Sequence, residues 1–129
     1  MAMDDEQYRR GEQIRASVLP AEYIARAKES ANSPLMQEFF DYTIKGAWGG
    51  VWGRPGLELK IRSLLSVTSL AVLNRPYELR IHLQGALNLG WTVEELREVF
   101  IHLSPYAGSP VTLDGLLILD ELTRESEAE

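Results

Sequence analysis

Apolar residues recur along most of this chain with the three- to four-residue spacing of helices, and prolines and glycines divide the pattern into segments. No alternating apolar and polar pattern of useful length predicts a strand. The pattern therefore predicts an all-α fold class, a compact single-domain bundle of six to seven helices. The expected helices span about residues 5–18, 20–30, 35–46, 57–73, 76–89, 92–104 and 111–124.

Start and stop signals support several of these boundaries. Thr92 and Glu95 have the spacing of a capping box, which begins a helix. The helix expected over residues 76–89 begins at Pro76 and ends at Gly90. The dipeptide Ser104-Pro105 is expected to kink or end the helix that begins at Thr92, because proline lacks a backbone N–H group.

Other stretches carry structural expectations of their own. Residues 57–73 leave few polar positions, which predicts a buried central helix. Residues 48–56 contain four glycines and a proline, so no regular element is expected throughout. Gly11 is expected to weaken the first helix, and the acidic tail at 125–129 is expected to fray.

The length of 129 residues indicates one domain over residues 1–129, with N-terminal helices in residues 1–34. The net charge of −6 argues against nucleic acid as a partner. The absence of cysteine excludes disulfides, thiolate nucleophiles and cysteine-ligated metals. No apolar run approaches the ~20 residues of a membrane span, and residues 1–6 are unlike a signal peptide. We therefore expect a cytoplasmic protein without a membrane partner.

The two histidines of the chain each follow a glutamate by four residues, in the pairs Glu78/His82 and Glu98/His102. On a helix, residues four apart share a face, so each pair can act as an acid/base unit in which glutamate orients imidazole. The alternative is an ordinary surface ion pair. We expect no metal, because the spacing differs from the Glu-x-x-His pattern of di-iron bundles and no further carboxylate ligands are evident.

Two other groups of residues are candidates for binding an anion. Trp48 and Trp52 are helical neighbours if the backbone there is helical, and Arg54 follows them. Two indoles beside a guanidinium can form the wall of an anionic pocket, whereas the alternative is packing in the core or a subunit interface. Arg62 lies inside the most apolar segment, where a charge is costly unless it is paired or lies at a pocket rim. Its alternative role is an ion pair with Glu58, four residues earlier.

The run from Ala47 to Leu57 (AWGGVWGRPGL) resembles the carboxymuconolactone decarboxylase family, and this run is a specific motif. The resemblance covers about residues 39–110, most of the chain. It continues in Lys60–Leu64 (KIRSL), Leu73–Arg75 (LNR), Glu78–His82 (ELRIH), Gly90–Thr92, Glu94–Glu95 and Glu98–His102.

This resemblance implies a cofactor-free all-α subunit, related to alkylhydroperoxidase-like proteins, that assembles into trimers or hexamers. It implies an enzyme, a carboxy-lyase that acts on a small anionic lactone-type substrate without metal or organic cofactor. The family's activity is loss of CO2 from 4-carboxymuconolactone to give 3-oxoadipate enol-lactone in aromatic catabolism, the β-ketoadipate pathway.

The chain departs from related patterns at two places. Where the wider superfamily has the redox motif Cys-x-x-Cys-x-x-x-His, this chain has Arg75, Glu78 and His82, so thiol peroxidase chemistry is excluded. Close relatives of the decarboxylase have Tyr-Cys-Gly-Val-Pro where this chain has Tyr106-Ala107-Gly108-Ser109-Pro110. Because this segment is expected to line the pocket, the substrate is less firmly indicated than the fold.

The reaction implied by the resemblance needs an oxyanion stabiliser and a proton donor. We predict His82 as the proton donor, Glu78 as the residue that orients it, and Arg62 or Arg54 as the group that holds a substrate carboxylate. Trp48, Trp52, His102 and Tyr106 are predicted to contact substrate. Two alternatives stay open: a cofactor-independent lyase or isomerase for a different lactone or enol acid, and a non-catalytic oligomeric binding protein.

Overall fold

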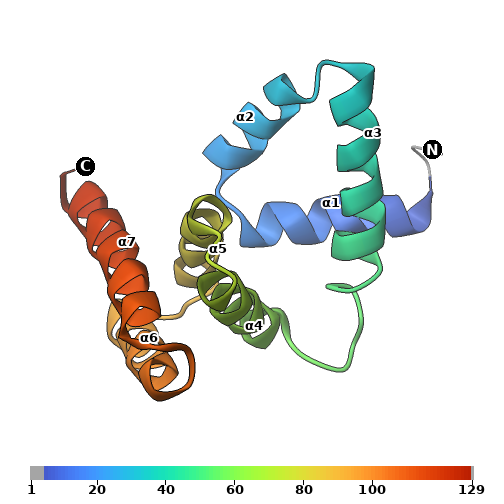
Figure 1. The fold of residues 1–129 in the computed structure, drawn as a ribbon. Helices are drawn as coiled ribbons and strands as arrows, with labels where there is room; N and C mark the ends of the chain where they lie inside the picture. The colour runs from blue at the N-terminus through green and yellow to red at the C-terminus, as the bar shows by residue number, and fades with distance from the viewer. Residues whose placement is uncertain (1–4, 129) are drawn as a thin grey trace. The chain divides into compact units, whose positions relative to one another are not determined.

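The computed structural model describes residues 5–128, and within that range it contains seven α-helices, one π-helix and no strand (Figure 1). The all-α prediction is therefore confirmed. The elements are α1 (Glu6–Val18), α2 (Ala21–Ser30), α3 (Pro34–Thr43), η1 (Ile44–Gly49), α4 (Leu59–Val72), α5 (Pro76–Asn88), α6 (Val93–Ala107) and α7 (Ser109–Ala128).

The contacts divide the chain into two compact units. The N-terminal unit, residues 1–59, contains α1, α2, α3 and η1, and the C-terminal unit, residues 60–129, contains α5, α6, α7 and nearly all of α4. The single-domain organisation expected from the chain length remains a prediction.

The N-terminal unit depends on a close approach between α1 and η1. A Cβ atom added at Gly11 would lie 2.0 Å from the carbonyl oxygen of Ile44, and one added at Gly49 would lie 2.3 Å from that of Gln7. Only glycine permits two backbones to approach so closely. Gly11 lowers the helix propensity of α1, but the packing of α1 against η1 requires a glycine at this position.

Polar contacts reinforce the same junction. Asp5 caps α1, since its Oδ1 accepts a hydrogen bond of 2.8 Å from the backbone N–H of Gln7, and it forms an ion pair with Lys45. The Gln7 side chain donates to the carbonyl oxygen of Lys45 at 2.9 Å. In η1 each backbone hydrogen bond joins residues five apart, as is usual for a π-helix. The N–H of Gly50, for example, donates to the carbonyl oxygen of Lys45 at 2.9 Å.

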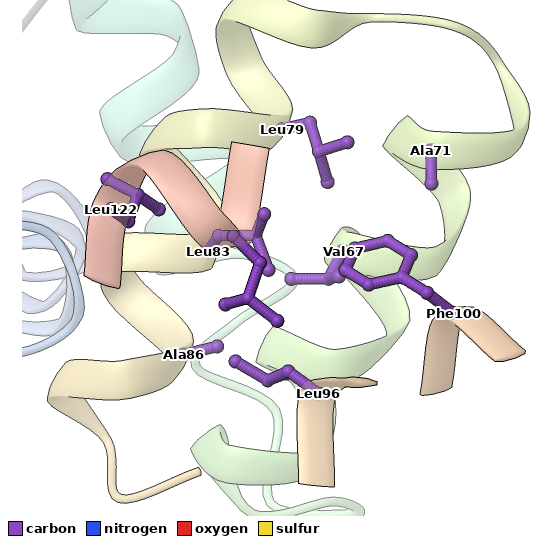
Figure 2. Close-up of a cluster of buried hydrophobic side chains, with 9 residues drawn as sticks. Val67, Ala71, Leu79, Leu83, Ala86, Leu96, Phe100 and Leu122 are labelled. Atoms are coloured by element: carbon purple, nitrogen blue, oxygen red, sulfur yellow. The ribbon is translucent and has the colours of Figure 1, made fainter. Parts of the chain in front are cut away.

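The C-terminal unit is built around one apolar core to which all four of its helices contribute (Figure 2). A Cβ atom added at Gly115 would lie 2.3 Å from the Phe100 ring, so α7 approaches this fully buried aromatic side chain directly. The core residues are Val67, Ala71, Leu79, Leu83, Ala86, Leu96, Phe100, Leu119 and Leu122.

Helix α4 is less buried than its composition predicts. It buries one stripe, formed by Ser63, Val67 and Ala71, whereas Leu65 and Val72 on another face are 52% and 50% exposed. The expectation of a buried central helix therefore holds for one face of α4 only, the face that reaches the core.

The connection from α5 to α6 follows the sequence signals closely. Gly90 adopts a φ of 103° after α5, and the N–H of Trp91 bonds the carbonyl oxygen of Ala86 at 3.0 Å. Thr92 and Glu95 form the predicted capping box. The Trp91 indole N–H donates to the carbonyl oxygen of Lys60 at 2.8 Å, which connects this junction to the start of α4.

Near the C-terminus two helices extend further than the sequence predicts. Pro105 does not end α6, which continues through Ala107; the left-handed φ of 99° at Gly108 ends it instead. Pro105 lacks the N–H group that would bond the carbonyl oxygen of Ile101, so α6 forms one helical bond fewer there and continues. The tail does not fray at 125: α7 is helical through Ala128, and Glu125 forms an ion pair with Arg80 of α5.

No helix in residues 5–128 has the length and apolarity to cross a bilayer.

The α1–η1 approach gives a direct prediction for Gly11→Ala. The added methyl group must displace backbone, so we expect a loss of about 1–3 kcal/mol in the free energy of unfolding, although alanine favours the helix. Urea unfolding followed by tryptophan fluorescence measures the effect. Gly56→Ala is the matched control, since a Cβ atom at Gly56 would have no neighbour within 4 Å. Equal stability of the two variants would contradict the packing account.

Candidate functional site

His82 lies at the edge of the core of the C-terminal unit. It is half-buried on α5, and its helical neighbours Leu79 and Ala86 both belong to the core cluster. Figure 2 shows the adjacent Leu83 among the core side chains of this helix. The imidazole is therefore attached to a rigid, well-packed helix face, as a group that must hold a defined position requires.

Burial determines the protonation of His82. Desolvation lowers the pKa of the imidazole below its usual 6.5, and the negative charge of Glu78 raises that pKa by a smaller amount. Desolvation thus outweighs the charge of Glu78, although that carboxylate lies one helical turn away. Glu78 is exposed, and its negative charge favours the protonated form of the His82 imidazole.

Helix α4 supplies Arg62 and Ser63. Arg62 is half-buried, and Ser63 beside it is completely buried. Glu58 immediately precedes the first residue of α4, four residues before Arg62, so the ion pair between them stays an alternative role for Arg62. The Ser63 hydroxyl is buried without a hydrogen-bond partner in the described part of the chain. Such a group costs about 1–3 kcal/mol. Sequence reasoning assigned Ser63 no role, because nothing in a serine within an apolar helix indicates an unsatisfied hydroxyl.

The second Glu-x-x-x-His pair lies on an exposed face of α6. Glu98 and His102 are both exposed, and Glu98 receives a 3.4 Å contact from Nε of Arg97. The centroids of the His102 and Tyr106 rings lie 5.5 Å apart, and Tyr106 is 79% exposed. In this chain His102 thus lies on a solvated helix surface, whereas His82 is half-buried.

The tryptophans belong to the N-terminal unit. Trp48 in η1 stacks on Trp52 with ring centroids 4.6 Å apart and an interplanar angle of 28°, and both side chains are buried. Arg54 follows in a turn and is exposed. The predicted proximity of the indoles is confirmed, and their burial favours the packing interpretation over an open pocket wall.

The candidate residues are thus divided between the two units: the indole pair and Arg54 belong to the N-terminal unit, and Arg62, Glu78, His82, His102 and Tyr106 belong to the C-terminal unit. Within residues 5–128, no three histidine or carboxylate side chains gather as metal ligands would. The chemistry of the C-terminal group is that of a proton carrier: an imidazole with a low pKa and a carboxylate one turn away.

The lowered pKa of His82 predicts a pH dependence of stability. Below about pH 6.5 the unfolded chain binds a proton at this residue before the folded chain does, so the free energy of unfolding falls as pH decreases toward the folded-state pKa. Urea unfolding at several pH values measures this slope. His82→Gln should remove this contribution and His102→Gln should keep it. An unchanged slope in His82→Gln would contradict the assignment.

Comparison with known proteins places these residues in a family. Residues 37–121 match the model of the carboxymuconolactone decarboxylase family. The chain is 36% identical over 122 residues to 4-carboxymuconolactone decarboxylase of Acinetobacter baylyi, covering 95% of this chain and 90% of the relative. It is also 36% identical over 121 residues to nitrosuccinic acid decarboxylase npaB of Metarhizium robertsii, covering 91% and 84%. The chain therefore belongs to the carboxymuconolactone decarboxylase family.

Proposed function

We propose that this protein is a cofactor-free decarboxylase, a carbon–carbon lyase that releases CO2 from a small carboxylated lactone to give an enol-lactone. The observation that carries the proposal is the 36% identity to 4-carboxymuconolactone decarboxylase over 95% of the chain. The half-buried His82, one turn after Glu78, supplies a proton carrier of the kind the reaction needs.

The chemistry defines what the protein must do. Loss of CO2 from the saturated ring carbon of such a lactone leaves the electron pair in the conjugated ring as a dienolate, with charge on the lactone carbonyl oxygen. A proton then adds to the ring carbon beside that carbonyl and gives the enol-lactone. The protein must stabilise the oxyanion and deliver one proton, tasks typically worth about 10²–10³-fold and 10²–10⁴-fold in rate respectively.

In this proposal His82 delivers the proton. Its low pKa leaves it neutral in the free protein near pH 7, and a substrate carboxylate bound beside it raises the pKa, as does the developing dienolate. The proton is thus taken up with the substrate, and Glu78 favours the imidazolium through its charge. Arg62 holds a substrate carboxylate, with Arg54 as the other candidate. Trp48, Trp52, His102 and Tyr106 remain predicted substrate contacts.

A second substrate class follows from the second relative. Decarboxylation of a 2-nitro acid such as nitrosuccinic acid leaves a nitronate, in which the charge also moves onto oxygen. The two reactions share the requirement for an oxyanion stabiliser and a proton donor. A nitro acid, a different lactone or enol acid, and a binding protein without turnover are therefore the alternatives to separate by assay.

We also propose that the protein self-associates into a trimer or a hexamer. Leu65 and Val72 lie two turns apart on the exposed face of α4, and Leu73 beyond the helix is 65% exposed. Apolar surface of this kind on a helix is typical of subunit interfaces. Light scattering at micromolar concentration should give a mass three or six times that of the chain; a monomer would contradict the proposal.

The catalytic proposal predicts a large effect of His82→Gln. With 4-carboxymuconolactone as substrate, ultraviolet absorbance follows the change in ring conjugation, and we expect kcat to fall by about 10²-fold or more. Glu78→Gln should cost less, because it keeps the imidazole and removes only the charge of Glu78 that raises the pKa of His82. Glu94→Gln, an exposed carboxylate in the first turn of α6, is the control and should keep full activity.

Circular dichroism and urea unfolding establish that each variant is folded. A stable His82→Gln protein within a few-fold of full activity would contradict the role of His82. Wild-type protein that turns over nitrosuccinic acid instead would assign the second substrate class. Turnover of neither acid would contradict the decarboxylase proposal.

A further inference from the structure

A buried arginine in the N-terminal unit lies outside the catalytic proposal. Helix α1 buries Tyr8, Gly11, Arg15 and Val18, which share one helix face. Tyr8, Gly11 and Val18 suit a core. Arg15 carries a charge, yet the residue as a whole is only 7% exposed. Arginine is almost never buried to this degree unless it is paired with an opposite charge.

In the part of the chain that the structure describes, no carboxylate forms an ion pair with Arg15. Among residues 5–128, none of the ion pairs or side-chain hydrogen bonds includes its guanidinium. The guanidinium carbon lies 5.9 Å from the centroid of the Phe40 ring, at the outer limit of a cation–π contact. The nearby carboxylate of Asp41 already accepts hydrogen bonds from Tyr8 at 3.1 Å and Gln37 at 2.9 Å.

Arg15 lines a cavity of about 220 Å³ formed by α1, α2, α3 and η1. Lys28 contributes a second cation to the lining, and Ala27, Ala31 and Ile44 contribute apolar surface. Glu12 also lines the cavity, but its side chain is exposed and forms no ion pair with Arg15 in the described chain. An engineered apolar cavity of ~150 Å³ holds a benzene molecule, so this cavity has room for a small ring.

We propose that this cavity is a binding site for a small carboxylate with an apolar body, whose carboxylate pairs with Arg15 and whose body lies against Phe40 and the aliphatic wall. A guanidinium binds a carboxylate through two parallel hydrogen bonds, so the ligand would supply a counter-charge for Arg15. None of the lining residues belongs to the catalytic proposal, so the site is independent of that proposal.

Benzoate is a suitable probe, because it combines one carboxylate with one ring. We expect isothermal titration calorimetry on the full chain to show saturable binding at millimolar concentration. Benzyl alcohol, which keeps the ring and lacks the charge, should bind far more weakly, and so should inorganic phosphate, which lacks the apolar body. Amide chemical shifts in ¹H–¹⁵N spectra should change in α1, α2 and α3; changes confined to α4 and α5 would contradict the assignment.

Three variants test the geometry. Arg15→Met keeps the length of the side chain and removes its charge, and should weaken benzoate binding by about tenfold or more. Arg26→Met removes the same charge from an exposed position on α2 and should leave binding unchanged. Ala31→Leu fills the cavity without changing the charge and should also abolish binding, which keeps the test decisive if Arg15→Met fails to fold. Absence of saturable binding, or full binding by Ala31→Leu, would overturn the proposal.

Discussion

The burial of α5 against the core of the C-terminal unit is the interaction on which the rest of the account depends. Leu79, Leu83 and Ala86 pack with residues of α4, α6 and α7, and this packing places His82 at the boundary of the core. The same packing removes water from the imidazole. Because removal of water outweighs the charge of Glu78, the pKa of His82 falls although a carboxylate lies one turn away.

A low pKa suits the proposed reaction. An imidazole that is neutral in the free protein gains a proton only when an anion arrives beside it, so protonation is coupled to substrate binding. The imidazolium formed in this way donates its proton readily. Once the anionic charge beside it is lost, its apolar surroundings favour the neutral imidazole. Apolar packing and catalytic proton transfer are thus two consequences of the same arrangement of α5.

The sequence predicted features that depend on local chemistry. The capping box at Thr92, the C-terminal glycine at Gly90 and the all-α class are confirmed, since each depends on the backbone preferences of a few neighbouring residues. Features that depend on which face is covered were missed. Composition alone does not tell which side of α4 meets the core, and four-residue spacing does not tell whether burial or charge determines the protonation of His82. The buried Arg15 was missed for the same reason, although a charge within an otherwise buried helix stripe is a signal that the sequence contains.

Titration of the His82 ring by NMR tests the central claim most directly, because it measures proton affinity in the free protein without substrate. The ring resonances, assigned by comparison with His82→Gln, should shift with a midpoint below 6.5. Glu78→Gln should lower the midpoint further, since it removes the one charge that opposes desolvation. A midpoint at or above 6.5 in the wild-type protein would contradict the claim that burial controls this histidine.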